Sequence, residues 1–143
     1  MFDIIVAILA FPNDPTNNVT AHQMFISEYS GTQLNLYSIS SILGKEKRVY
    51  GPDKDDYLTI LHPKYLTNGF KVPSFIDCTK MYSISIDSSM NLSALTNRIV
   101  DPSLKQRILN KINDIKRKDK LMVFNISSTD FKSWNSKLYK TNK

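Results

Sequence analysis

The stretch GFKVPSFIDCTKMYSISID, residues 69–87, contains the signals that decide the fold of this chain. Gly69 permits turn conformations that a residue with a Cβ resists, and Pro73 fixes one backbone angle and donates no hydrogen bond. Both features are typical of a loop that leads into a strand. The residues after Pro73 alternate, so a long strand is predicted, with one face formed by Ile76, Cys78, Lys80, Tyr82, Ile84 and Ile86.

Three strands are predicted in the first 42 residues. Apolar residues indicate a first strand over 3–11, and two prolines and several Asn and Asp residues indicate a loop over 12–20. Strands are predicted over 21–29 and 33–42. The Ser-Gly-Thr sequence at 30–32 between them is a tight turn, so these two strands should form a hairpin.

The middle of the chain is less regular. A polar, basic turn is predicted over 44–48, a short strand over 48–50 and another over 57–61. Residues 62–68 are irregular or form a turn of helix. Residues 91–100 contain features of both a helical turn and a strand end.

A basic amphipathic helix is predicted over 102–117. Asp101 can cap it, and Pro102 suits the first helical position. Its apolar stripe consists of Leu104, Ile108, Ile112 and Ile115. A last strand over 121–126 follows.

These elements indicate a mainly β, α+β fold. Several short strands separated by turns favour a small barrel or a strongly bent antiparallel sheet, covered by one C-terminal helix. A chain of 143 residues suits one domain. We expect that domain to span residues 1–126, and residues 127–143 to form a basic tail or a short helix.

Charge and cysteine content narrow the function classes. The formal net charge is +6 and the pI about 9.4, which favours RNA, DNA or an acidic protein as partner, although a basic surface also simply aids solubility. Cys78 is the one cysteine, so no intrachain disulfide forms, and its apolar strand favours an inert core thiol.

The first apolar run argues against a membrane or secretory role. Its leading charge is Asp3 rather than a cation, and residues 4–11 are far fewer than the roughly 20 that span a bilayer. We therefore expect a cytoplasmic protein with no membrane partner.

Most catalytic signatures are absent. The chain has no glycine-rich phosphate loop, and His22 and His62 stand too far apart in sequence for a metal-ligand motif. We therefore expect no metal and no cofactor. Asp53, Asp55 and Asp56 allow a Mg²⁺ role, but they are typical of a solvated turn.

One pair of residues has the chemistry of a catalytic site. His22 begins the second strand and Ser40 ends the third, so counting outward from the 30–32 turn places them roughly opposite each other. An imidazole beside a hydroxyl can exchange protons near neutral pH, whereas a lone histidine at a strand start is often structural.

The order of these parts resembles the PemK/MazF family of toxins. The shared features are the Asp-Ile-Ile-Val strand from Asp3, the Pro/Asn loop, the hairpin that ends in Ser-Ile-Ser-Ser at 38–41, the KVPSFI segment at 71–76 and the helix from Pro102. The resemblance implies an SH3-like barrel, a homodimer and metal-independent cleavage of single-stranded RNA. It also implies a small acidic antitoxin protein that blocks the RNA groove.

Site residues follow from the same resemblance. Ser40 matches a family hydroxyl that donates to the phosphate, and His22 stands where the family has an arginine. Histidine suits proton transfer but cannot reproduce a permanent bidentate phosphate clamp. Candidate RNA contacts are Lys45, Lys47, Arg48, Lys71 and Ser74, although the first three are equally typical of a solvated basic turn. Nearby Tyr37, Tyr50 and Tyr57 suit base stacking or ordinary packing.

Two main function classes and one weaker option remain open from the sequence. The first is a toxin-like endoribonuclease. The second is a catalytically inactive barrel that binds nucleic acid or a partner protein, which the missing arginine favours. A regulator whose groove contacts another protein is a third option.

Overall fold

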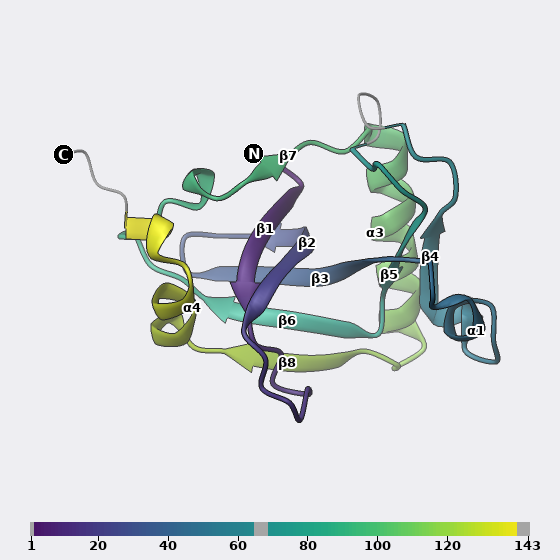
Figure 1. Ribbon diagram of the computed structural model, residues 1–143, viewed down its shortest axis with the longest axis horizontal. Helices are drawn as coiled ribbons and strands as arrows, with labels where there is room; N and C mark the ends of the chain where they lie inside the picture. The colour runs from purple at the N-terminus through teal and green to yellow at the C-terminus, as the bar shows by residue number, and fades with distance from the viewer. Residues whose placement is uncertain (1, 65–68, 140–143) are drawn as a thin grey trace.

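The computed structural model describes residues 2–64 and 69–139, and within these ranges the strands form one sheet (Figure 1). The strands are β1 (Ile4–Leu9), β2 (Thr20–Tyr29), β3 (Gln33–Ser41), β4 (Tyr57–Ile60), β5 (Ser74–Asp77), β6 (Lys80–Ser85), β7 (Asn97–Arg98) and β8 (Met122–Ile126). The helices are α1 (Glu46–Val49), α3 (Pro102–Arg117) and α4 (Ser128–Trp134). Short 3₁₀ turns occupy η1 (Lys54–Asp56), η2 (Leu92–Ala94) and η3 (Ser136–Tyr139).

The prediction of a mainly β, α+β fold is confirmed. The strand order is β4-β5-β3-β2-β1-β7, and β6 pairs with β3 and, in parallel, with β8. Of the two predicted architectures, the open sheet is the one observed, because the described strands leave β4 and β7 unjoined at the two ends of this order. The closed barrel is therefore not formed.

The predicted hairpin of β2 and β3 is confirmed. The two strands pair antiparallel from Gln23 opposite Ile39 to Tyr29 opposite Leu34. The turn is closed by a backbone hydrogen bond of 2.9 Å from Ser30 to Gln33. A bulge between Ile26 and Glu28 shifts the register by one residue, from Glu28 opposite Asn35 to Ile26 opposite Leu36, so the pairing near His22 depends on this bulge.

The predicted long strand after Pro73 is wrong in one respect, because it is two strands. The Asp77 carboxylate accepts hydrogen bonds from the Thr79 backbone N–H (3.0 Å) and hydroxyl (2.6 Å) and folds a turn there. The turn ends the alternation. Ile76 and Cys78 enter one core, and Tyr82, Ile84 and Ile86 enter the other.

The predicted short strand over 48–50 is also wrong, since this segment belongs to α1. Val49 donates to the Lys45 carbonyl (3.0 Å) and Tyr50 to the Glu46 carbonyl (2.9 Å), so local bonds replace a sheet ladder. Gly51 permits the close turn that follows, because a Cβ there would lie 2.4 Å from the Lys47 carbonyl oxygen.

The predictions for the other irregular segments can be compared with the structure in part. The strand predicted over 57–61 is confirmed as β4. Residues 91–100 contain both features that the sequence suggested, a helical turn at η2 and a strand at β7. The prediction for 62–68 falls partly on residues 65–68, which lie outside the described residues.

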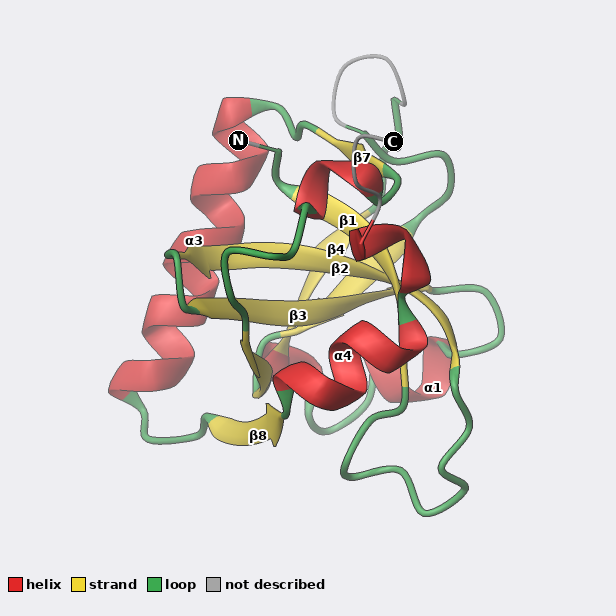
Figure 2. Cartoon of the chain, turned by 90° about the vertical axis from the view of Figure 1, so that its left-hand side faces the viewer, coloured by secondary structure: helices red, strands yellow, loops and turns green. Residues whose placement is uncertain are grey.

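Helix α3 covers one face of the sheet (Figure 2). Its predicted cap and bounds are confirmed, since the Asp101 carboxylate accepts from the backbone N–H groups of Ser103 and Leu104. The buried stripe of the helix packs on residues from several strands: Ile4, Phe25, Tyr37, Ile39 and Ile76. Buried Asp3 pairs with Lys105 at 2.8 Å and ties the first strand to the helix.

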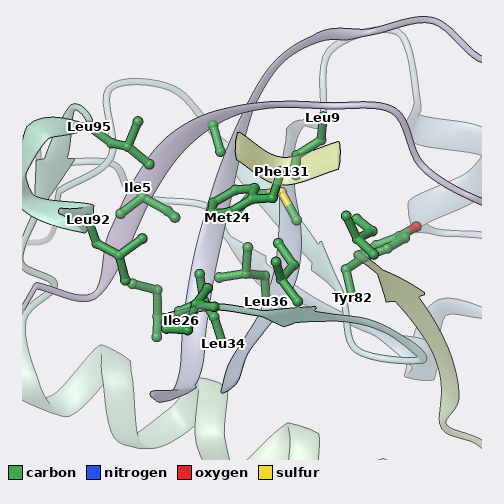
Figure 3. Packing of buried hydrophobic residues seen from close by; sticks show 14 of the residues in the cluster. Ile5, Leu9, Met24, Ile26, Leu34, Leu36, Tyr82, Leu92, Leu95 and Phe131 are labelled. Carbon is green, nitrogen blue, oxygen red and sulfur yellow. The ribbon is translucent and has the colours of Figure 1, made fainter. Parts of the chain in front are cut away.

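A second core lies on the opposite face, under α4 (Figure 3). It is formed mainly by β1, β2, β3 and β6, and α4 adds Phe131, which is fully buried. The Asn135 side chain accepts from the Ile8 N–H (2.8 Å) and donates to the Ile8 carbonyl (2.9 Å), so it satisfies part of the β1 edge. Residues 127–139 thus pack on the sheet, and residues 140–143 lie outside the described part.

Candidate functional site

His22 and Ser40 lie at the end of the hairpin distant from its turn. The ladder of β2 and β3 ends with Gln23 opposite Ile39, so His22 and Ser40 are the next residues beyond its last pair, one on each strand. Both residues are half-buried, so neither is sealed in a core. Among the interactions described for residues 2–64 and 69–139, the side chains of His22 and Ser40 are not hydrogen-bonded to each other.

The surroundings of His22 favour a neutral imidazole. Its Nε2 lies 3.0 Å from the Thr20 hydroxyl oxygen, and the Phe11 ring lies 4.3 Å away between centroids. Partial burial lowers the pKa of His22 below its usual 6.5; the Asp14 carboxylate opposes this and the Lys45 ammonium reinforces it. At neutral pH the ring is therefore uncharged and able to accept a proton.

Cationic side chains lie beside Ser40. Phe75 of β5 pairs with Ser40, and the Lys45 ammonium lies 5.9 Å from the centre of the Phe75 ring. The Arg48 guanidinium lies 5.5 Å from the same ring. Helix α1 and its N-cap residue Lys45 thus hold two cations over the strand that adjoins Ser40.

Arg48 is fixed by two further partners. Its Nη2 lies 3.1 Å from the Asp77 carboxylate and its Nε donates to the Tyr57 hydroxyl at 3.1 Å. The Arg48 side chain nevertheless remains 48% exposed, so it is oriented and also accessible to solvent. This combination suits an anion-binding group.

Asp77 is the buried anion that organises this corner. Burial alone would raise its pKa, but the hydrogen bonds from Lys80 and Thr79 outweigh burial and lower the pKa below 3.8. The Lys80 ammonium lies 2.8 Å from its carboxylate. Asp77 therefore stays ionised at neutral pH and holds Arg48 in place.

Two of the predicted RNA contacts lie elsewhere. Lys71 and Ser74 line a cavity of about 350 Å³ together with Gln23 and Arg98. Gln23 follows His22 on β2, and successive side chains of a strand point to opposite faces, so this cavity lies across the sheet from His22. Ser74 is also buried and donates to the Val72 carbonyl at 2.8 Å.

The structure therefore divides the predicted site residues. It brings His22, Ser40, Lys45 and Arg48 to one face and separates Lys71 and Ser74 from them. Lys47 is exposed on α1. Among the predicted stacking residues, Tyr37 is fully buried and cannot reach a base, Tyr50 is exposed, and Tyr57 bonds to Arg48.

Sequence reasoning missed Asp77 and Asp14. Asp77 falls inside the long strand predicted after Pro73, and the alternating pattern gives no sign of the turn that directs its carboxylate to Arg48. An Asp two residues before a Thr is a turn signal that could have revealed it. Asp14, which acts on His22, lies in a loop whose course the sequence does not give.

Other chemistry of the described residues is limited. No group of three or more His, Cys, Asp or Glu side chains in 2–64 and 69–139 is arranged to hold a metal ion. Burial raises the pKa of the Cys78 thiol to about 12, so it is not a nucleophile at neutral pH. Among the described helices none combines the length and apolarity that a bilayer crossing requires.

Comparison of the chain with protein-family models, with curated proteins and with solved structures finds no match. The resemblance to PemK/MazF toxins therefore remains a prediction from short motifs. Any function has to be argued from the residues described above.

Proposed function

We propose that this protein is an endoribonuclease that cleaves single-stranded RNA without a metal ion. The observation that carries the proposal is the neutral imidazole of His22, which lies with Ser40 just beyond the last pair of β2 and β3, beside the cations Lys45 and Arg48. Cleavage of RNA by the adjacent ribose hydroxyl requires a proton acceptor, a hydroxyl donor and fixed positive charge.

In this reaction His22 takes the proton of the ribose 2′-hydroxyl. The freed 2′-oxygen attacks the phosphorus, the bond from phosphorus to the 5′-oxygen breaks, and that oxygen leaves with a proton drawn from solvent. The products are a 2′,3′-cyclic phosphate and a 5′-hydroxyl end. Ser40 donates a hydrogen bond to the phosphate as its charge develops.

Arg48 and Lys45 compensate for the arginine that His22 replaces. A histidine with a lowered pKa carries no charge at neutral pH, so the phosphate needs its cation from another element. Arg48 is oriented by Asp77 and Tyr57 and is accessible, and Lys45 acts on the same surface. The proposal thus assigns proton transfer to β2 and charge neutralisation to α1.

A binding module without catalysis is the second candidate. It is favoured by the existing bonds of the site, because Arg48 is committed to Asp77 and Tyr57, and His22 to Thr20. In this version the basic surface binds RNA or an acidic protein through charge alone.

The decisive experiment incubates the purified chain with varied single-stranded RNAs in the presence of a chelator. We expect cleavage, and we expect His22→Ala and Ser40→Ala each to lower its rate about 100-fold or more while the fold survives. His62→Ala is the matched control, since His62 lines a different cavity, and its rate should stay unchanged. RNA that remains intact while salt-sensitive binding persists would replace the enzyme by the binding module.

The proposed partners follow from the toxin resemblance. A homodimer and a small acidic antitoxin protein are proposed, and the basic surface supplies charge complementarity for the latter. Expression of the chain alone should arrest growth, and co-expression of a small acidic protein encoded beside it should relieve the arrest. Growth that is unaffected would argue against a toxin.

A further inference from the structure

We infer that the cavity between the loop after β1, strand β8 and helix α4 is a subsite for an unpaired guanine base of the RNA. The inference rests on the proposed function, because the occupant is part of the substrate. The cavity measures about 270 Å³, and its lining consists of Ala10, Phe11, Pro12, Asn17, Asn125, Ile126, Asp130 and Trp134. In Figure 1 the loop after β1 runs past β8, on the same side of the sheet as α4.

Two aromatic residues line this cavity. Phe11 comes from the loop and Trp134 from the end of α4, and both are only partly buried. Unpaired bases of single-stranded RNA are bound mainly by stacking on aromatic side chains. The Phe11 ring already packs against the rings of His22 and Tyr82, so Trp134 is the residue available for stacking and Phe11 forms an apolar wall. This lining suits a planar base better than a flexible aliphatic ligand.

The position of Phe11 links the cavity to the catalytic residues. The Phe11 ring lies 4.3 Å from the His22 ring and stacks on Tyr82 at 4.4 Å between centroids. The Tyr82 hydroxyl donates to the Asn13 side chain at 3.1 Å, which fixes the loop near Phe11. A base in the cavity would thus adjoin the phosphate beside His22.

Polar groups at the cavity remain available for a base. The side chains of Asn17, Asn125 and Asp130 are exposed and make no hydrogen bond or ion pair within residues 2–64 and 69–139. The Asp130 backbone N–H bonds to the Ser127 hydroxyl, so the helix turn that bears the carboxylate is fixed.

The Asp130 carboxylate decides which base is preferred. A carboxylate accepts hydrogen bonds only, and guanine alone presents two adjacent N–H donors on its Watson–Crick edge. The asparagine amides can serve the remaining acceptors of the base. Guanine is therefore the base that this set of groups binds best.

Trp134 makes the test direct, because it is the one tryptophan of the chain. The full chain is titrated with short 2′-O-methyl oligonucleotides that differ in one base and cannot be cleaved, since the attacking hydroxyl is blocked. We expect quenching of Trp134 fluorescence at concentrations about tenfold lower for the guanine oligonucleotide than for the other three.

Two variants sharpen the result. Asp130→Asn should abolish the guanine preference, and Asp55→Asn, which removes an exposed carboxylate at η1, should leave it unchanged. His22→Ala should stop cleavage of ordinary RNA and leave the quenching in place. Thermal melting of each variant confirms that it is folded.

The outcomes separate this inference from the proposed function. Guanine-selective quenching without cleavage of ordinary RNA would sustain the subsite and remove the nuclease. Cleavage with equal quenching by all four bases, or with a preference that Asp130→Asn leaves intact, would overturn the subsite and retain the nuclease.

Discussion

At the scale of single residues, the surroundings of His22 matter more than its place in the sequence. The ring is partly buried against Phe11 and senses two opposite charges, Asp14 and Lys45. Burial and Lys45 together outweigh Asp14, which keeps the ring neutral at physiological pH. This is the protonation state that a general base needs.

Lys45→Ala tests this balance. Removal of the cation should raise the pKa of His22, because positive charge nearby disfavours the imidazolium. A pH titration of the ring signals by NMR, with His62→Ala to assign them, measures the pKa. The pH below which RNA cleavage slows should therefore be higher in Lys45→Ala than in the wild type. Lys47→Ala is the control, and an equal shift in both variants would contradict the assignment.

At the scale of elements, the turn between β5 and β6 connects the sheet to α1. Asp77 closes the turn through Thr79 and also receives Arg48 from α1 and Lys80 from β6. One buried carboxylate therefore fixes both the strand break and the orientation of the candidate anion-binding group.

Asp77→Asn should destabilise the fold by about 1–3 kcal/mol at neutral pH, because two charged hydrogen bonds lose their anion. Folding lowers the pKa of Asp77. The stabilisation that the ionised carboxylate gives to the fold is therefore present above pH 3.8 and is lost as the pH falls through the folded-state pKa. Denaturant unfolding at several pH values should show the difference between wild type and variant shrinking below that range.

Exposed Asp55→Asn is the control for this measurement, with an expected change within about 0.5 kcal/mol. A gap between wild type and Asp77→Asn that is constant from pH 7 to acid would mean that the ionised carboxylate is not what stabilises the turn.

At the scale of the whole molecule, the sheet has a core on each face, and the C-terminal segment closes one of them. Helix α3 covers one face, and α4 with η3 covers part of the other through Phe131 and Leu138. Asn135 also binds the free edge of β1. Residues up to 139 are therefore part of the folded unit.

Phe131→Ala should cost about 3–5 kcal/mol in unfolding free energy, since a fully buried ring is replaced by a cavity. Exposed Thr129→Ala on the same helix should change stability by no more than about 0.5 kcal/mol. Denaturant unfolding followed by circular dichroism measures both. Equal stabilities would show that α4 is not part of the cooperative core.

How far the sequence predicts this protein depends on the range of the interactions involved. The hairpin and helix α3 could be predicted, because alternation, a tight turn, an N-cap and a 3.6-residue stripe are local signals. The position of His22 relative to Ser40 is predicted only approximately. The register at the turn, with Tyr29 opposite Leu34, would extend to His22 opposite Ser41, and the bulge between Ile26 and Glu28 moves it by one residue toward Ser40.

Only the tertiary structure decided the rest of the candidate site. The break at Asp77 and the helix at Glu46–Val49 are closed by local hydrogen bonds, but which local pattern prevails over strand alternation is decided by the surrounding fold. The separation of Lys71 and Ser74 from His22, and the pairing of Arg48 with Asp77, depend on contacts between residues distant in sequence. The sequence by itself determined the α+β class, the hairpin and the net positive charge. The open sheet, the neutral state of His22 and the closing role of α4 come from packing and burial, which no local pattern encodes.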